Sequence, residues 1–444
     1  MHPPIHEIPT AHAPESLAAL LLNSQPPIRN PHSGVVLLRT SSFDSPSARY
    51  SFVTANPFLT FRSCGSRCEI SFPNSQLPSP ISQTQFGNPW HLLDSLMSRF
   101  ELLDEMDLPF PLGGCFGYWG YDLKNFAEPK LPRRAGNDLE LPDCHVGFYD
   151  SLVVFDHRLG QTFVVSTGLA ADGSRSETRA REQLEFWQTH LVKTRTPALS
   201  LSERVRENNL SAGECASDTQ SRSGFRKPLP LPGGRAGVRA DVVSNCSKID
   251  FLSAVERAQR YIRAGDIYQV NLSQRLTAPC NFSGLPRQSA LAMPGWELFQ
   301  KLDAASPAPF SAFLDCADFQ VASSSPEQFL HLSGSHIQTR PIKGTRPRDA
   351  DPTRDAQLAY ELQTSAKELA ELVMITDLLR NDLGKVCEFG SVQTPELARL
   401  ERFAQVQHLV STVEGRLRKD VSHFAALASC FPGGSITGAP KFRA

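Results

Sequence analysis

The chain has 444 residues, and its 45 Lys and Arg against 46 Asp and Glu give a formal net charge of −1. With 40% hydrophobic residues it can bury the cores of two or three domain-sized units, and the balanced charge without a basic block argues against a nucleic-acid partner. No apolar run approaches the roughly 18 residues that span a bilayer, and 10 scattered cysteines favour free thiols in a reducing cytoplasm.

The first 195 residues alternate short strand patterns with amphipathic helix patterns. The apolar stretch Leu17–Leu22 is predicted to be the first turns of a helix, because no basic segment precedes it as in a signal peptide. Two further helices are predicted after Asn88-Pro89 and over about 176–192, where apolar residues recur at helical spacing. Strands are predicted at Val35–Leu38, Tyr50–Val53, Phe148–Phe155 and Thr162–Ser166.

Residues 196–247 differ in composition from the rest of the chain. They are rich in Ser, Gly, Pro, Arg and Asn, and Phe225 is their only aromatic residue. Such a segment cannot bury enough apolar surface to fold alone. We therefore expect a flexible linker or insertion between an N-terminal region, 1–195, and a C-terminal region, 248–444.

The C-terminal region begins with a predicted helix from about Ile249, which ends at Gly265, a residue suited to a positive φ angle. Its helical spacing predicts burial of Phe251, Leu252, Val255, Ala258 and Ile262. The alternation in DIYQVNLSQRL, residues 266–276, predicts a strand. Further strands are predicted at Phe319–Ser323, Phe329–Leu332 and His336–Arg340, and a long helix at about Ser365–Asn381. Separate strands and helices without a regular βαβ repeat predict an α+β fold with large antiparallel sheets.

Two polar residues follow strand patterns in the C-terminal region. SSSPEQFL places Glu327 in a turn between two predicted strands, and TRPIKGTRPR places Lys343 beside Gly344 at the end of another. A lysine in such a position is most often a surface cation. An uncharged lysine amine is also one of the few side chains that can serve as a nucleophile, so Lys343 is a candidate catalytic residue.

Two further motifs are compatible with ligand binding. Glu368 and Glu371 stand at i and i+3 in KELAELVMITDLLRND, which is either a solvated acidic helix face or a Mg²⁺ site. FPGGSITGAPK, which ends at Lys441, is a glycine-rich turn predicted to lead into a helix. Its backbone N–H groups and Lys441 would suit a bound carboxylate, although most such turns have no ligand.

Taken in order, these motifs closely resemble the chorismate-utilising enzymes, which include the synthase subunits of anthranilate synthase and aminodeoxychorismate synthase, isochorismate synthase and salicylate synthase. The resemblance runs from about Ile249 to Ala444 through GDIYQVNLSQR, SSSPEQFL, RPIKGTRPR, AELVMITDLLRNDLG, VQHLVSTVEG and FPGGSITGAPK. It extends to RYSFVTANP and PFPLGGCFGYWGYDL in the N-terminal region. It implies an anthranilate synthase component I-like α+β fold, in which large antiparallel sheets pack as a sandwich with flanking helices.

Two positions distinguish the members of this family. In family members that activate water, a similar strand carries a lysine at the position of Gln269. An amide cannot act as a general base, so the resemblance implies that ammonia is the nucleophile. In anthranilate synthases the corresponding motif resembles PIAGT, whereas this chain has PIKGT, in which the lysine is Lys343. The resemblance to aminodeoxychorismate synthases implies that Lys343 attacks ring carbon C2 of chorismate, that Glu327 protonates the departing C4 hydroxyl as the general acid/base, and that ammonia then attacks C4.

The resemblance also implies roles for the remaining motif residues. Glu371 matches a ligand of the Mg²⁺ cofactor and Glu368 an acidic position one turn earlier, while Leu372 departs from the family's usual His or Asn. His408 matches a histidine near the substrate ring, with a buried structural histidine as the alternative. The implied chorismate contacts are Gln269, Gly344, Thr345, His408, Gly433, Gly434, Gly438 and Lys441.

The function implied is the synthase component of an aminodeoxychorismate synthase, in the cytoplasm. It would make 4-amino-4-deoxychorismate for 4-aminobenzoate and folate from chorismate and glutamine-derived ammonia, supplied by a separate glutaminase subunit. The alternatives are anthranilate synthase component I and an inactive chorismate-binding or glutaminase-docking subunit. Family members continue beyond the position of Ala444 with a second Mg²⁺-ligating Glu and a carboxylate-binding Arg, so the catalytic region 248–444 is expected to be C-terminally incomplete.

Overall fold

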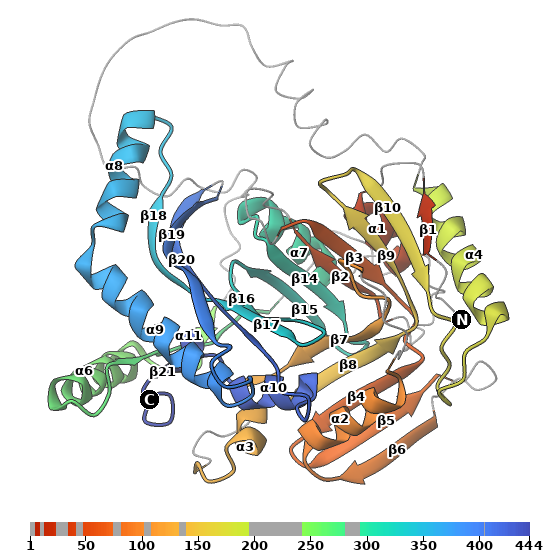
Figure 1. Ribbon diagram of the computed structural model, residues 1–444, viewed down its shortest axis with the longest axis horizontal. Coiled ribbons are helices and arrows are strands. Elements are labelled where there is room, and N and C mark those ends of the chain that lie inside the picture. The colour runs from red at the N-terminus through yellow and green to blue at the C-terminus, as the bar shows by residue number, and fades with distance from the viewer. Residues whose placement is uncertain are drawn as a thin grey trace, which may run out of the picture.

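The computed structural model describes residues 5–8, 13–23, 34–40, 48–73, 81–101, 108–132, 139–194, 242–279, 294–403 and 405–444. Helices and antiparallel sheets in these segments form an α+β fold, as predicted, with the N-terminal sheets on one side and the long C-terminal helices on the other (Figure 1). Of the predicted linker, only 242–247 lie within the described residues. None of the described helices has the length and apolar character needed to cross a membrane.

The largest sheet has seven antiparallel strands and combines both regions of the chain. Its strands, in spatial order, are β1 (Ile5–Ile8), β10 (Gln161–Ser166), β9 (Ser151–Asp156), β3 (Tyr50–Thr54), β2 (Val36–Arg39), β14 (Phe310–Asp315) and β15 (Gln320–Ser325). Strand β14 pairs with β2, so that Phe313 stands opposite Leu37. The hairpin of β14 and β15 therefore extends a sheet begun by the N-terminal strands.

Three helices cover one face of this sheet and form its main core. They are α1 (Pro14–Asn23), α4 (Glu177–Lys193) and α7 (Pro294–Ala305). Leu17, Trp187 and Phe299 are almost completely buried against the sheet, and the Trp187 indole N–H donates to Ser151 Oγ at 2.9 Å. The apolar spacing that predicted α4 thus corresponds to the face that this helix turns towards the sheet.

A second antiparallel sheet of five strands packs against short helices. Its strands are β6 (Ile81–Phe86), β5 (Arg67–Phe72), β4 (Leu59–Cys64), β8 (Cys144–Tyr149) and β7 (Gly114–Trp119), and its helices are α2 (Pro89–Arg99), η1 (Tyr121–Leu123) and α3 (Lys124–Ala127). The prediction of one strand over 148–155 is wrong, because the chain leaves β8 at Asp150 and enters β9 in the seven-stranded sheet. The buried Asp150 carboxylate accepts from Arg179 Nε at 2.8 Å, which holds this crossing point.

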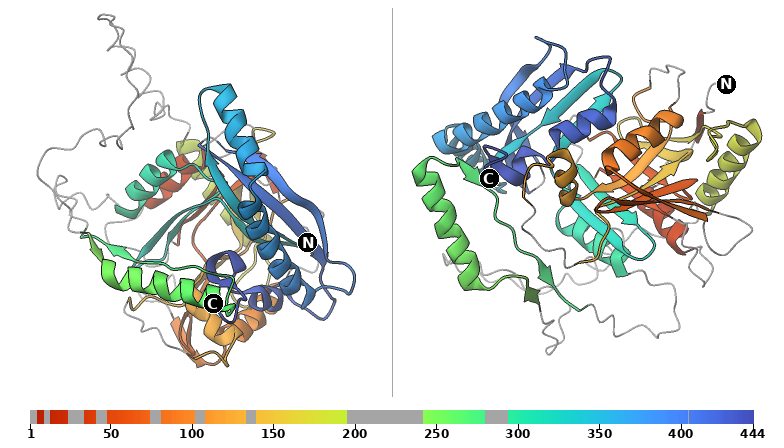
Figure 2. Two further views of the ribbon diagram at one scale, coloured as in Figure 1. Left: turned by 90° about the vertical axis from the view of Figure 1, so that its left-hand side faces the viewer. Right: turned by 90° about the horizontal axis from the view of Figure 1, so that it is seen from below.

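The third sheet carries the C-terminal motifs. Its strands are β16 (Gln328–Ser333), β17 (His336–Arg340), β20 (Val406–Arg416), β18 (Ile342–Pro347) and β19 (Gln393–Arg402). The helices α8 (Pro352–Gln363) and α9 (Ala366–Gly384) run along this sheet, as the left view of Figure 2 shows. The prediction of α9 is confirmed; the Ser365 hydroxyl accepts from the Glu368 backbone N–H at 3.4 Å and so caps the helix.

Helix α6 (Lys248–Ala264) has the predicted boundaries but not the predicted burial. It begins after the cap Ser247 and ends at Gly265, whose φ of 78° is left-handed as expected. None of its residues is buried, and Leu252 and Ile262 are 51% and 43% exposed. Helical spacing identifies an apolar face but not an element that covers it, and α6 lies at the margin of the molecule in Figure 2.

The predicted strand over residues 266–276 is also wrong. Only two short strands form there, β12 (Gln269–Val270) and β13 (Leu276–Thr277). They pair with β21 (Gly438–Ala439) and β11 (Val243–Ser244), each a two-residue strand. Alternating side chains permit a strand, but its length is set by the neighbouring edge with which it can form hydrogen bonds.

Candidate active site

Glu327 lies in the turn between β15 and β16, as predicted, and its carboxylate is held by two donors. The Ser435 hydroxyl donates to Glu327 Oε1 at 2.6 Å, and the Ile342 backbone N–H donates to the same atom at 3.4 Å. Burial raises the pKa of Glu327, while these two hydrogen bonds and the nearby Lys343 charge act in the opposite direction. A carboxyl group of this kind keeps its proton to a higher pH than an exposed glutamate.

Lys343 is the second residue of β18, which pairs with β20, while the strand that follows Glu327, β16, pairs with β17. Lys343 stands opposite Leu409 of β20, and its charge is close enough to Glu327 to influence that carboxyl group. Within the part of the chain that the structure describes, the side chain of Lys343 forms no hydrogen bond or ion pair. Its amine is therefore not committed to a structural contact.

Gly344 forms a β-bulge directly after Lys343. Lys343 pairs with Leu409 and Thr345 with His408, so Gly344 is the extra residue between them, with a φ of 75°. A Cβ atom at this position would lie 2.8 Å from Leu362 Cδ1 and 3.1 Å from Glu368 Cβ. Only glycine fits both the backbone angle and this space, and such bulges direct neighbouring side chains at many active sites.

His408 of β20 lies directly beside this bulge. Its Nδ1 lies 3.0 Å from Thr345 Oγ1 and 3.3 Å from the Gly344 carbonyl oxygen. Burial lowers the pKa of His408, partly opposed by the Gly344 carbonyl and the Glu401 carboxylate, so the neutral ring is favoured. The structure therefore places Gly344, Thr345 and His408 in one cluster next to Lys343.

Glu368 and Glu371 project one turn apart from α9, and only Glu368 contacts the bulge. Glu368 is mostly buried, with Oε1 at 3.6 Å from Arg346 Nη1, whereas Glu371 is partly exposed, with Oε1 at 3.7 Å from Lys367 Nζ. Carboxylate oxygens are the donors that Mg²⁺ prefers, and the absence of a Cβ at Gly344 keeps Glu368 Oε2 clear of an atom that would otherwise lie 3.2 Å from it. The described residues contain no cluster of three or more His, Cys, Asp or Glu side chains that could hold a metal by themselves. The pair thus suits an ion whose remaining ligands are water or substrate.

The glycine-rich segment returns the end of the chain to this cluster. It contains α11 (Gly434–Thr437) and β21, and β21 pairs with β12 so that Gln269 faces Ala439. A Cβ at Gly433 would lie 3.1 Å from Phe329 Cε2, and Cβ atoms at Gly434 and Gly438 would overlap Leu378 and the Gln269 backbone. All three predicted glycines therefore have a packing reason to lack a side chain.

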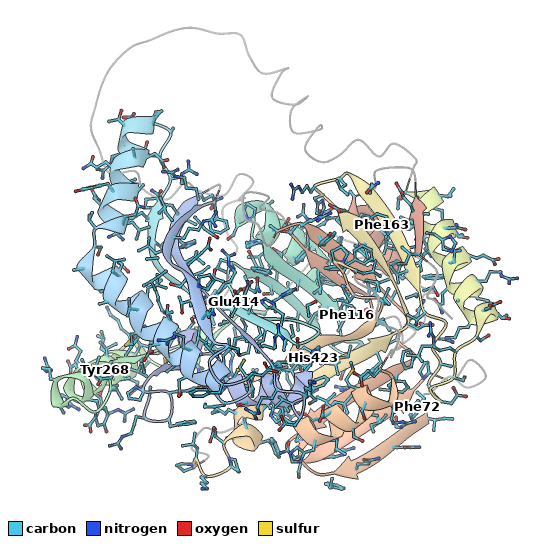
Figure 3. All side chains as sticks on the ribbon, viewed as in Figure 1. Phe72, Phe116, Phe163, Tyr268, Glu414 and His423 are labelled. Carbon is cyan, nitrogen blue, oxygen red and sulfur yellow. The ribbon has the colours of Figure 1, made fainter. Side chains whose placement is uncertain are left out.

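Gln269 and Lys441 differ in how their polar atoms are satisfied. The Gln269 side-chain oxygen is buried without a hydrogen-bond partner among the described residues, although the preceding Tyr268 is exposed at the margin of the molecule (Figure 3). The Lys441 amine instead donates to Asp382 Oδ2 at 2.9 Å and to the Cys430 carbonyl at 2.7 Å. No hydrogen bond or ion pair joins Lys441 or Glu371 to Lys343 or Glu327 in the described segments.

Two residues that the sequence analysis did not single out contact the predicted ones. Ser435 belongs to the glycine-rich motif and Asp382 to the α9 motif, but each finds its partner at a distance of 108 and 59 residues along the chain. No local periodicity marks such pairs. Only membership of a quoted motif could have drawn attention to them.

Comparison with known proteins identifies the family of the chain. The chorismate binding enzyme family matches residues 56–444. The chain is 34% identical over 411 residues to aminodeoxychorismate synthase component 1 of Escherichia coli strain K12, covering 92% of this chain and 76% of that protein. It is also 34% identical over 400 residues to anthranilate synthase component 1 of Acetivibrio thermocellus, covering 89% of this chain and 72% of that protein.

The fold has a solved counterpart. The crystal structure of anthranilate synthase component I from Streptococcus pneumoniae matches with a TM-score of 0.64 and 25% identity, covering 90% of this chain and 76% of that one. The predicted fold class is therefore confirmed. A family match over most of the sequence, relatives at 34% identity and a shared fold show that the chain belongs to the chorismate-utilising enzymes of the anthranilate synthase and aminodeoxychorismate synthase family.

Proposed function

We propose that this chain is the synthase component of an aminodeoxychorismate synthase, which converts chorismate and ammonia into 4-amino-4-deoxychorismate. The observation that carries the proposal is Lys343, whose amine has no hydrogen-bond or ion-pair partner among the described residues and whose charge acts on the partly buried carboxyl group of Glu327. Relatives with the anthranilate and aminodeoxychorismate names match at the same 34% identity, so overall similarity does not decide between the two reactions. The lysine at position 343 supports the aminodeoxychorismate reaction.

The proposed reaction has two displacements. In the first, Lys343 gives its ammonium proton to the Glu327 carboxylate, the uncharged amine forms a bond to ring carbon C2, the ring double bonds shift, and the C4 hydroxyl leaves as water with that proton. In the second, ammonia forms a bond to C4, the double bonds shift back, and the C2–N bond to Lys343 breaks. The amino group thus ends para to the ring carboxylate, and the lysine is regenerated. Glu327 is suited to the first step because its raised pKa keeps a proton available.

One further feature supports ammonia as the second nucleophile. Gln269 offers an amide oxygen that can accept an N–H from ammonia but cannot remove a proton from water, and this oxygen is buried without a partner among the described residues. Ammonia would be released from glutamine by a separate glutaminase subunit. The chain alone would then turn over with ammonium salts but not with glutamine, and glutamine-dependent turnover by the isolated chain would contradict the proposal.

The direct test is product analysis. The purified chain is incubated with chorismate, Mg²⁺ and ammonium, and the products are separated by chromatography. We expect 4-amino-4-deoxychorismate. Anthranilate, recognised by its fluorescence, as the main product would instead assign the chain to anthranilate synthase, and no chorismate consumption at all would favour an inactive binding subunit.

We also propose that Glu371, with Glu368 beside it, holds the Mg²⁺ ion that the family resemblance implies. When bound, the ion would neutralise carboxylate charge on the substrate. Replacing Glu371 with glutamine removes one anionic ligand, so the Mg²⁺ concentration for half-maximal activity should rise about 10- to 100-fold. The measurement is a Mg²⁺ titration of chorismate consumption.

The matched control is Asp377→Asn, since Asp377 is an exposed carboxylate on the same helix and, among the residues that the structure describes, pairs only with Arg380. It should leave the Mg²⁺ requirement unchanged. An unchanged requirement in Glu371→Gln as well would remove Glu371 from the metal site.

A further inference from the structure

A buried ion pair joins α9 to the last residues of the glycine-rich segment. The Asp382 side chain is 1% exposed and that of Lys441 is 7% exposed, and Lys441 Nζ donates to Asp382 Oδ2 at 2.9 Å. The second oxygen of Asp382 accepts from Lys385 Nζ at 2.8 Å, and Lys385 is 35% exposed. Lys441, whose charge is removed from water, therefore depends on Asp382 to balance it, whereas the charge of Lys385 is also balanced by solvent.

Lys441 also closes the segment upon itself. Its amine donates to the carbonyl oxygen of Cys430 at 2.7 Å, and Cys430 is the last residue of α10 (His423–Cys430). The chain from Cys430 to Lys441 thus leaves α10 and returns to the same point. Asp382 fixes this point to α9, the helix that also carries Glu368 and Glu371.

Several candidate site groups depend on the position of this loop. Ser435, within it, donates to Glu327 at 2.6 Å. The loop strand β21 accepts hydrogen bonds from Tyr268 N and, through Thr437 just before it, from Asn271 N, so it also fixes β12 with Gln269. A shift of the loop away from α9 would therefore release the Ser435 hydroxyl from Glu327.

We infer that Asp382 is a positioning residue, which holds Lys441 and thereby keeps the Ser435 hydroxyl on the Glu327 carboxyl group. The inference rests on the family's chorismate chemistry with Glu327 as the acid. This positioning role is the same whether the product carries its amino group para or ortho to the ring carboxylate. The inference assigns Lys441 to the loop anchor, in place of the substrate-carboxylate contact expected from the motif.

The test measures chorismate consumption without regard to product. Asp382→Asn keeps the size of the side chain but removes the charge that holds Lys441, so kcat should fall about 10- to 100-fold with a much smaller change in KM. Lys441→Met should act in the same direction. It serves as the second variant if Asp382→Asn fails to fold.

A double-mutant cycle with Ser435→Ala separates positioning from general damage. If Asp382 acts through Ser435, most of the kcat effect of Asp382→Asn disappears in the Ser435→Ala background. If Asp382 only supports the fold, the two variants lower kcat independently, and the double variant shows the product of the two factors. That result would overturn the inference.

Hydrogen exchange provides a readout that needs no turnover. Amides 431–441, together with those of Tyr268 and Asn271, should exchange about tenfold faster in Asp382→Asn and Lys441→Met than in the unmodified chain. Lys385→Met is the matched control, because Lys385 touches the same carboxylate from the exposed side, and it should change neither kcat nor exchange. Unchanged exchange in both loop variants would overturn the inference, whereas an ortho product from the unmodified chain would contradict only the proposed function.

Discussion

Replacing Lys343 with alanine is expected to suppress formation of the para amino product by on the order of 10³-fold or more, because the amine that opens the reaction at C2 is lost. Chorismate binding should largely survive, since the nucleophile is used mainly in the chemical step. The space left by the side chain would admit ammonia near C2, so a small amount of ortho product is also expected. The measurements are product analysis with ammonium and the dissociation constant for chorismate.

Lys343→Arg should not restore activity, because a guanidinium group stays protonated and cannot attack carbon. Mass spectrometry of the quenched, unmodified enzyme should reveal a substrate-derived adduct on the peptide that contains Lys343. Lys419→Ala, at an exposed position after β20, is the control for the loss of a lysine and should behave as the unmodified chain. Para product at the unmodified rate from Lys343→Ala would exclude the covalent role.

Replacing Glu327 with glutamine is expected to lower kcat by about 10²- to 10⁴-fold, because an amide cannot give a proton to the departing hydroxyl. Burial raises the pKa of Glu327, so the protonated form that the first step requires persists above the pH at which an exposed glutamate has ionised. Activity should accordingly fall as the pH rises through this pKa. The pH–rate profile of chorismate consumption measures this fall, which forms the high-pH limb of the profile.

Ser435→Ala tests the assignment of Glu327 as the general acid, because it should shift the pH dependence of activity. The Ser435 hydroxyl both orients the Glu327 carboxyl group and stabilises its ionised form. Its removal should lower kcat as Asp382→Asn does, and it should also raise the pKa of Glu327 further and move the high-pH limb to higher pH. Lys343 is the charged group that faces Glu327, and it remains in place in this variant. Glu361→Gln, an exposed carboxylate on α8, is the control and should keep the original profile. A downward movement of the limb in Ser435→Ala would show that Glu327 is not the group being titrated.

The elements that sequence predicted well are those whose signals are local. Helix α9 begins at Ser365 because a serine hydroxyl caps the first turn, and α6 ends at Gly265 because glycine adopts a left-handed φ without strain. The turn position of Glu327 between β15 and β16 followed from two neighbouring apolar runs. Each of these features depends on residues within a few positions of one another.

The predictions that failed concern what covers an element or where a strand changes partner. The apolar face of α6 was assigned to the core, yet Leu252 and Ile262 are exposed, because periodicity does not specify a neighbour. The run from Phe148 to Phe155 was assigned to one strand, yet it is shared between two sheets that separate at Asp150. Both outcomes depend on segments far away in the chain.

By itself, the sequence determined the family, the fold class and which residue types are available for the chemistry, because these are carried by ordered motifs such as PIKGT around Lys343. Only the tertiary structure decided which of these residues meet. Ser435 reaches Glu327 across 108 positions, and Lys441 is bound to Asp382 across 59. The physical reason is that a buried hydrogen bond or ion pair forms where packing brings its two partners together in space, irrespective of their separation along the chain.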